Sequence, residues 1–122
     1  MLGAIAAGAP IEAIENPEPV EVPDRLRTSG ECYVLEVKGD SMIEAGILDG
    51  DWVVIEKRSH ARDGEIVVAL TDGENATLKR IRQLPDRVLL IPENSAMEPI
   101  EVAPDQVQIQ GVLVGQMRAY QP

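Results

Sequence analysis

The residues able to do chemistry in this sequence are few, and they limit the choice of mechanism. The chain holds one histidine, His60, and one cysteine, Cys32. A Ser–His triad, a Cys–His pair, a Cys/His zinc site and an internal disulfide are therefore hard to build. His60 lies in a polar stretch, residues 58–62, where we expect it to face solvent. The remaining well-attested way to activate a serine is an unprotonated lysine.

Lys79 differs from the other two lysines, Lys38 and Lys57, which lie at expected strand ends beside other charges. Strand alternation puts Lys79 on the face opposite two arginines, Arg80 and Arg82, with Leu78 on the arginine face. If the arginine face is solvated, Lys79 points inward, where desolvation lowers the pKa of an amine. It could then act as a neutral base, although inward lysines on half-buried strands more often extend their amine to solvent.

Ser41 is the candidate nucleophile, in the run Gly39-Asp40-Ser41-Met42. This run follows an expected strand and opens a short helical turn over residues 41–45. A serine there presents its hydroxyl beside backbone N–H groups that could hold an oxyanion. It could equally be an ordinary helix N-cap, and these four residues by themselves favour the cap.

The elements that must position these residues are short strands separated by turn signals, which predicts an all-β fold. We expect strands over residues 32–37, 52–56, 65–71, 76–82, 87–91 and 107–114. Residues 72–75 should form a hairpin, residues 11–23 an extended surface crossing and residues 24–31 a loop. Because the chain has two tyrosines, one tryptophan and no phenylalanine, its core must be built from aliphatic residues and methionine.

The charge balance argues against nucleic-acid binding by this chain itself. It has 11 basic and 21 acidic residues, a formal net charge of -10. Such a surface repels phosphate backbones, and its simplest role is solubility. No apolar run is long enough to span a membrane, and residues 1–8 lack the basic region of a secretory signal. We therefore expect a cytoplasmic protein with no membrane partner.

Several motifs stand in one order along the chain. They are Ala6-Ala7-Gly8 with Pro10, Gly39-Asp40-Ser41-Met42 followed by residues 46–51, Thr77-Leu78-Lys79-Arg80, residues 92–95 and residues 111–115. Together they closely resemble the C-terminal autoprotease domain of LexA-type SOS repressors, a group that includes UmuD-type mutagenesis proteins and phage repressors. The resemblance spans essentially the whole chain.

The resemblance implies a highly twisted, multi-sheet β fold shared with signal peptidases, with at most one or two short helical turns. Residues 1–23 would form the cleavage segment and crossing, and residues 31–122 the catalytic core, in a single domain. Carried over, Ser41 is the nucleophile and Lys79 the general base. The scissile bond joins Ala7 to Gly8.

The same resemblance implies the surroundings of that bond. Ile5, Ala6 and Pro10 belong to the substrate segment, and the backbone N–H groups of Asp40 and Ser41 form the oxyanion hole. No metal or cofactor is implied. In the UmuD-type branch the residue before the scissile glycine is typically Cys, whereas alanine here favours the repressor branch.

The family's partners define the expected biology. A RecA filament on single-stranded DNA favours the cleavable form, and cleavage inactivates the repressor and induces the SOS response to DNA damage. The family's N-terminal helix-turn-helix domain is absent from this chain, so we expect an isolated catalytic and dimerisation domain that reaches operator DNA only through that missing part. The apolar residues 107–114 suggest an uncovered edge strand, which predicts a homodimer through residues 107–118.

Two other functions remain open from the sequence. One is a UmuD-like or phage-repressor-like module that dimerises and contacts RecA without cleaving itself. The other is a metal site built from Asp40, Asp49, Asp51 and Asp72, although aspartate is favoured in turns for local reasons. Incubation at alkaline pH separates all three, because only the autopeptidase yields a cut between Ala7 and Gly8.

Overall fold

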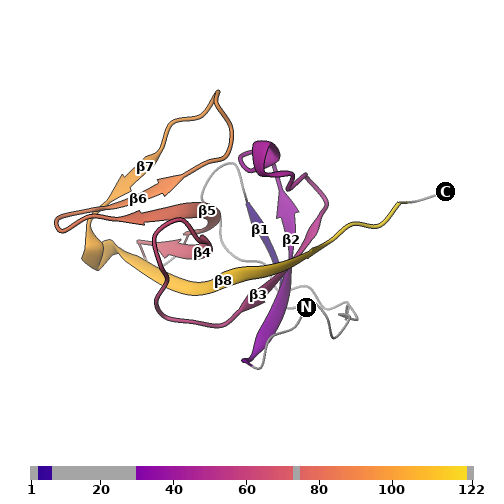
Figure 1. Cartoon of the computed structure of the whole chain (residues 1–122), viewed down its shortest axis with the longest axis horizontal. Helices are drawn as coiled ribbons and strands as arrows, with labels where there is room; N and C mark the ends of the chain where they lie inside the picture. Colours follow the sequence, from indigo (N-terminus) through magenta and orange to yellow (C-terminus); the bar gives the residue numbers. More distant parts are fainter. Residues whose placement is uncertain (1–2, 7–29, 73–74, 121–122) are drawn as a thin grey trace.

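A single curled β-sheet forms the body of the molecule in the computed structural model, which describes residues 3–6, 30–72 and 75–120 (Figure 1). Its strands are β1 (Gly3–Ala6), β2 (Cys32–Lys38), β3 (Trp52–Glu56), β4 (Ile66–Thr71), β5 (Asn75–Gln83), β6 (Val88–Ile91), β7 (Ile100–Val102) and β8 (Val107–Met117). Two short 3-10 helices, η2 (Ile43–Ala45) and η3 (Pro104–Gln106), are the helical elements of the described residues. The expected all-β class is confirmed.

The order of strands across the sheet is β1-β2-β3-β8-β4-β5-β6-β7. Neighbours are antiparallel except β1 and β2, which run parallel. β1 also pairs with β5 in parallel, so the sheet curls until its first strand meets its sixth. This closure brings β2 and β5, the strands that precede Ser41 and carry Lys79, to either side of β1.

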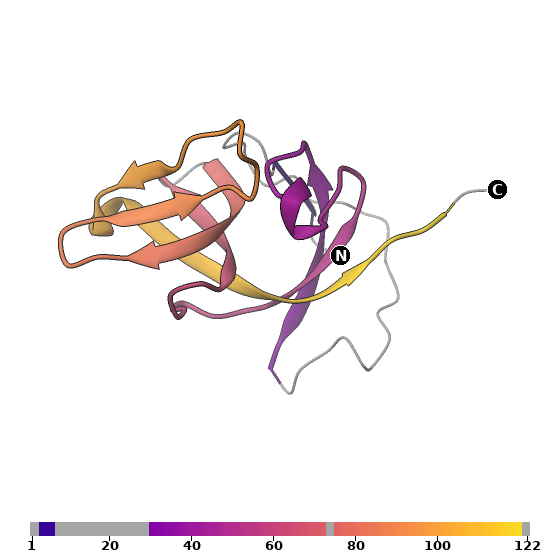
Figure 2. The same cartoon turned by 45° about the horizontal axis from the view of Figure 1, so that its top comes forward.

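β8 is the long strand that joins the two halves of the sheet. It runs beneath β4–β7 on one side and β1–β3 on the other in both views (Figures 1 and 2). Gly111 lies where β8 crosses β3, and a Cβ there would stand 2.3 Å from the Ile55 side chain and 2.7 Å from the Glu56 carbonyl oxygen. The close crossing therefore requires glycine.

The core is aliphatic, as the composition predicts, and falls into two clusters. The first is Leu35, Val37, Met42, Ile47, Val53, Ile55, Val68, Ala76 and Leu78. The second is Val67, Ala69, Ile81, Val88, Leu90 and Val112. β5 contributes to both clusters, so its middle is covered on both faces.

Most expected strands are confirmed, with ends that differ by a residue or so. The antiparallel pairing of β4 with β5, which sets Thr71 opposite Asn75, confirms the hairpin. β7 was not predicted, because three residues are too short for a recognisable pattern. The expected crossing over residues 11–23 lies outside the described residues, as does the loop over residues 24–29.

Two expectations are wrong. The helical turn does not start at Ser41: η2 begins after Met42, which makes no side-chain capping bond. Nor is β8 an uncovered edge, since it lies between β3 and β4. Its apolar sequence reflects burial at the centre of the sheet. Among the described residues, 107–111 pair only with β4 and 113–117 only with β3, so each half of β8 has one neighbour.

Among residues 3–6, 30–72 and 75–120, no helix has the length and apolar character needed to cross a membrane.

Candidate active site

Lys79 is buried in the middle of β5, with 1% of its surface exposed. Its Nζ donates a hydrogen bond to Thr77 Oγ1 at 2.5 Å. Burial lowers the pKa of Lys79 to about 8, because the interior solvates an ammonium poorly. The inward orientation predicted from strand alternation is confirmed, and the alternative of an amine extended to solvent is wrong.

The other parts of the lysine argument have mixed outcomes. Lys38 and Lys57 are exposed, and they form ion pairs with Glu36 at 3.1 Å and Glu31 at 3.9 Å, as their positions predicted. Leu78, however, is fully buried although it was placed on the arginine face. Both faces of β5 are therefore covered at this point, and burial of Lys79 does not depend on a solvated opposite face.

Ser41 is fully buried in the turn that follows β2. Its Oγ has no hydrogen-bond partner in the part of the chain that the structure describes. A buried hydroxyl without a partner is unfavourable, so such atoms in native proteins usually have a functional reason. The alternative role as a helix N-cap is wrong, since that role would give the hydroxyl a backbone donor. The next residue, Met42, is also fully buried and packs in the first core cluster, which anchors the turn.

The backbone around Ser41 is tied to the end of β2. Val37 exchanges two backbone hydrogen bonds with the far end of the turn, from its N–H to the Asp51 carbonyl and from the Gly50 N–H to its own carbonyl, both at 2.8 Å. The Gly39 N–H donates to Asp49 Oδ1 at 2.8 Å. The turn therefore leaves β2 and returns to it within a closed loop.

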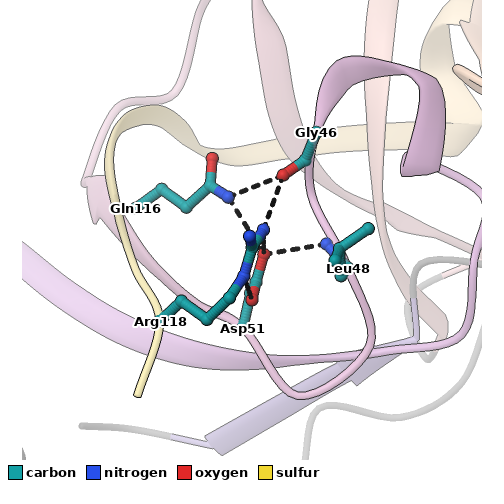
Figure 3. A network of polar contacts seen from close by, with 5 residues as sticks. All are labelled: Gly46, Leu48, Asp51, Gln116 and Arg118. Atoms are coloured by element: carbon teal, nitrogen blue, oxygen red, sulfur yellow. Dashed lines mark hydrogen bonds and ion pairs between the residues drawn. The ribbon is translucent and has the colours of Figure 1, made fainter. Parts of the chain in front are cut away.

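A polar network links this loop to the end of β8 (Figure 3). Arg118 binds both carboxylate oxygens of the buried Asp51, at 2.6 and 2.7 Å, and also donates to the Gly46 carbonyl at 2.9 Å. Gln116 donates to Asp51 at 2.9 Å and to the same carbonyl at 2.8 Å. The Leu48 N–H supplies a further bond to the carboxylate at 2.8 Å. The Arg118 hydrogen bond is the main reason that the pKa of Asp51 lies below its usual value.

The opposite side of the loop is held by the connection between β6 and β7. The Glu44 N–H donates to the Glu93 carbonyl at 2.8 Å, and Asn94 Nδ2 donates to the Asp40 carbonyl at 3.0 Å. Ser95 donates twice to the Glu44 carboxylate, which lowers the pKa of Glu44. Residues 92–95 had been noted in the sequence only as a late motif.

β1 ends beside both chemical elements. Ala6 is in register with Lys38 on β2 and with Thr77 on β5. Ser41 follows Lys38 by three residues, and Lys79 follows Thr77 by two. Ile5 and Ala6 thus lie in a strand next to the candidate nucleophile and base. The other predicted substrate residues, Ala7, Gly8 and Pro10, lie outside the described residues.

The aspartates proposed as metal ligands have local roles. Asp49 and Asp51 accept the hydrogen bonds given above, and Asp72 adopts a positive φ of 54° in the hairpin turn. Within the described ranges, no group of three or more His, Cys, Asp or Glu side chains could hold a metal ion. His60 is exposed, as expected.

Sequence reasoning missed the residues that hold the loop: Thr77 as a partner of Lys79, and Arg118, Gln116 and Asn94 as partners of the turn. An inward-facing threonine two residues before an inward lysine is a signal that the alternation argument could have used. The other partners lie 50 or more residues away from the atoms they bind, and no local pattern reveals them.

Comparisons with known proteins agree with this geometry. A family model described as Peptidase S24-like matches residues 1–114. The LexA repressor of Syntrophotalea carbinolica is 52% identical over 121 residues, which cover 98% of this chain and 59% of that protein. The LexA repressors of Erythrobacter litoralis and Novosphingobium aromaticivorans are 53% and 52% identical, over 97% of this chain. The chain spans 50–59% of the length of these three relatives.

We predict that Arg118→Ala lowers the free energy of unfolding at pH 7 by about 2–3 kcal/mol, because it leaves the Asp51 carboxylate buried without its charged partner. Chemical denaturation measures the loss. The matched control is Arg87→Ala, whose ion pair with Glu101 spans 3.5 Å at the surface and should contribute less than about 1 kcal/mol.

The difference between wild type and Arg118→Ala should shrink in acid. Because the folded-state pKa of Asp51 is lowered, the stabilisation is present above the unfolded-state value and is lost as the pH falls through the folded one. Equal losses for the two arginine variants at pH 7 would contradict the role of the network.

Proposed function

Because the chain belongs to the peptidase S24-like family, we propose that this LexA-type peptidase domain is a serine autopeptidase that cuts its own Ala7–Gly8 bond. Ser41 is the nucleophile and Lys79 the general base. One observation carries the proposal: β1 ends with Ala6 in register with Lys38 and Thr77, close in sequence to both residues. A substrate held in the same chain reacts at a high effective concentration.

The burial of the two side chains supports these roles. The Ser41 hydroxyl has no hydrogen-bond partner in the described part of the chain, so it is not committed to a structural bond. The Lys79 amine, with a pKa of about 8, is partly neutral near physiological pH, and a neutral amine can accept the serine proton. Thr77 orients that amine through its hydroxyl.

The reaction follows from these roles. Lys79 takes the Ser41 proton, and Oγ attacks the Ala7 carbonyl carbon. The negative oxygen that forms is stabilised by the backbone N–H groups of Asp40 and Ser41. The bond between Ala7 and Gly8 then breaks, and Lys79 returns the proton to the leaving amine. Water hydrolyses the remaining ester between Ser41 and Ala7.

The wider function is proposed from the relatives, which are LexA repressors. Cleavage would separate this domain from a DNA-binding domain in the whole repressor and so inactivate it, inducing the SOS response in the cytoplasm. A RecA filament on single-stranded DNA would stimulate cleavage by stabilising the form in which the cleavage segment is docked. The net charge of -10 fits a domain that does not itself bind operator DNA.

A binding module without peptidase activity is the competing proposal. It gives no reason for a buried lysine with a lowered pKa or for a buried hydroxyl without a described partner, both of which are unfavourable for stability.

The decisive experiment is incubation of the purified chain between pH 6 and 10, with the products identified by mass spectrometry. We predict one cut, between Ala7 and Gly8. The rate should rise about tenfold from pH 7 to a plateau above pH 9, because the neutral fraction of a base with a pKa of about 8 rises in that way. Activated RecA should raise the rate at pH 7.

Ser41→Ala and Lys79→Met should abolish the cut, because the first removes the attacking atom and the second the base. Lys57→Ala is the matched control for loss of a lysine and should cut at the wild-type rate, since this side chain is exposed. A cut by Lys79→Met, or a rate that is flat from pH 6 to 10, would contradict the assigned base.

We also propose that the domain forms a twofold homodimer through β8, although the reason differs from the sequence-based one. In the described structure, residues 107–111 of this strand have no neighbour on the side away from β4. Backbone groups along such an edge can pair with a second copy.

Sedimentation at tens of micromolar should show a dimer, and Ile109→Pro should shift it toward monomer because proline removes a backbone donor from the edge. Gln106→Pro, which lies in η3 just before the strand, is the control and should leave the dimer intact. A monomer for the wild-type chain would contradict this assembly.

A further inference from the structure

The connection between β6 and β7 contacts the Ser41 turn at several points. Its residues 93–95 bind Asp40 through Asn94 and bind Glu44 through Glu93 and Ser95. Both cartoon views show this connection beside η2 (Figures 1 and 2). Arg80, the neighbour of Lys79 on β5, forms an ion pair with the Glu93 side chain. Residues 93–95 therefore join the strand of the base to the turn of the nucleophile.

One of these contacts acts on the peptide bond that carries the Ser41 N–H. Asn94 Nδ2 donates to the Asp40 carbonyl at 3.0 Å. That carbonyl and the Ser41 N–H belong to the same planar peptide unit, which is trans, since no described peptide is cis. In a trans peptide the two groups point in opposite directions. A carbonyl held toward Asn94 therefore directs the Ser41 N–H away from residues 93–96.

Asn94 is itself held in one orientation. Its Oδ1 accepts a hydrogen bond from the Ala96 N–H at 2.9 Å, which leaves Nδ2 facing Asp40. The Asp40 carbonyl also accepts the Ile43 N–H at 3.2 Å, the first bond of the turn. Two donors from different segments thus fix the direction of one peptide unit.

We propose that Asn94 is a positioning residue for self-cleavage: by binding the Asp40 carbonyl, it aims the Ser41 N–H at the oxyanion of the reaction. This inference rests on the proposed function. Loss of one oxyanion donor typically slows a serine peptidase by about 10²–10³-fold. Because the Asn94 variants misdirect this donor rather than remove it, we expect the plateau rate of self-cleavage to fall by roughly tenfold to a hundredfold.

The test uses two variants and a matched control. Asn94→Asp keeps the acceptor for Ala96 but loses the donor, and Asn94→Ala loses both. Ser95→Ala removes a neighbouring side-chain bond to Glu44 that does not involve Asp40. Thermal unfolding establishes that each variant is folded, and the pH profile of self-cleavage gives the plateau rate and the apparent pKa for each.

A second readout isolates the oxyanion from docking of the cleavage segment. An organophosphonyl fluoride labels an activated serine: the bond from Oγ to phosphorus forms, the P–F bond breaks, and Lys79 takes the proton while fluoride leaves. The phosphonyl oxygen uses the same N–H donors as a peptide oxyanion. We expect both Asn94 variants to lose labelling rate and self-cleavage rate by similar factors, with the apparent pKa still about 8. Ser95→Ala should behave like wild type.

Three results would overturn the inference while wild type still cuts between Ala7 and Gly8. The first is a plateau rate within twofold of wild type in both Asn94 variants. The second is slower self-cleavage with unchanged labelling, which would assign Asn94 to docking of the segment. The third is a shifted apparent pKa, which would assign it to Lys79. Failure of the wild-type chain to cut would instead overturn the proposed function.

Discussion

The burial of one amine is the constraint on which the rest of this structure depends. A lysine side chain loses hydration when it is enclosed, and the neutral form becomes easier to populate. Enclosing Lys79 requires cover on both faces of β5, which the two core clusters provide. It also requires a sheet that curls far enough for β1 to reach β5. The long strand β8 and its glycine at the crossing with β3 allow that curvature.

The same architecture explains why the Ser41 turn is so heavily tied. A buried hydroxyl without a partner destabilises its own surroundings, so other contacts must hold the turn in place. Met42 and Ile47 anchor it in the core, the Asp51–Arg118 ion pair holds one side and residues 93–95 hold the other. The reactive groups are therefore positioned by residues that take no part in the reaction themselves.

The sequence predicted those parts of the molecule that depend on local pattern. Strand alternation identified Lys79 as inward, and the scarcity of aromatics identified an aliphatic core. The same reasoning failed for β8, because an apolar run reads alike at a sheet edge and at a sheet centre. It also failed for Asp51, which resembles an ordinary turn aspartate until Arg118, 67 residues later, is brought beside it. Such long-range partners follow from strand order, which no local pattern encodes.

The central claim is that the fold keeps Lys79 partly neutral near physiological pH. The most direct test is an NMR titration of the Lys79 side chain in the Ser41→Ala variant, where no cleavage interferes, with Lys57 observed in the same sample. The account predicts that Lys79 titrates near pH 8 and Lys57 near the free-lysine value of about 10.4. A Lys79 titration that coincides with that of Lys57 would contradict the account.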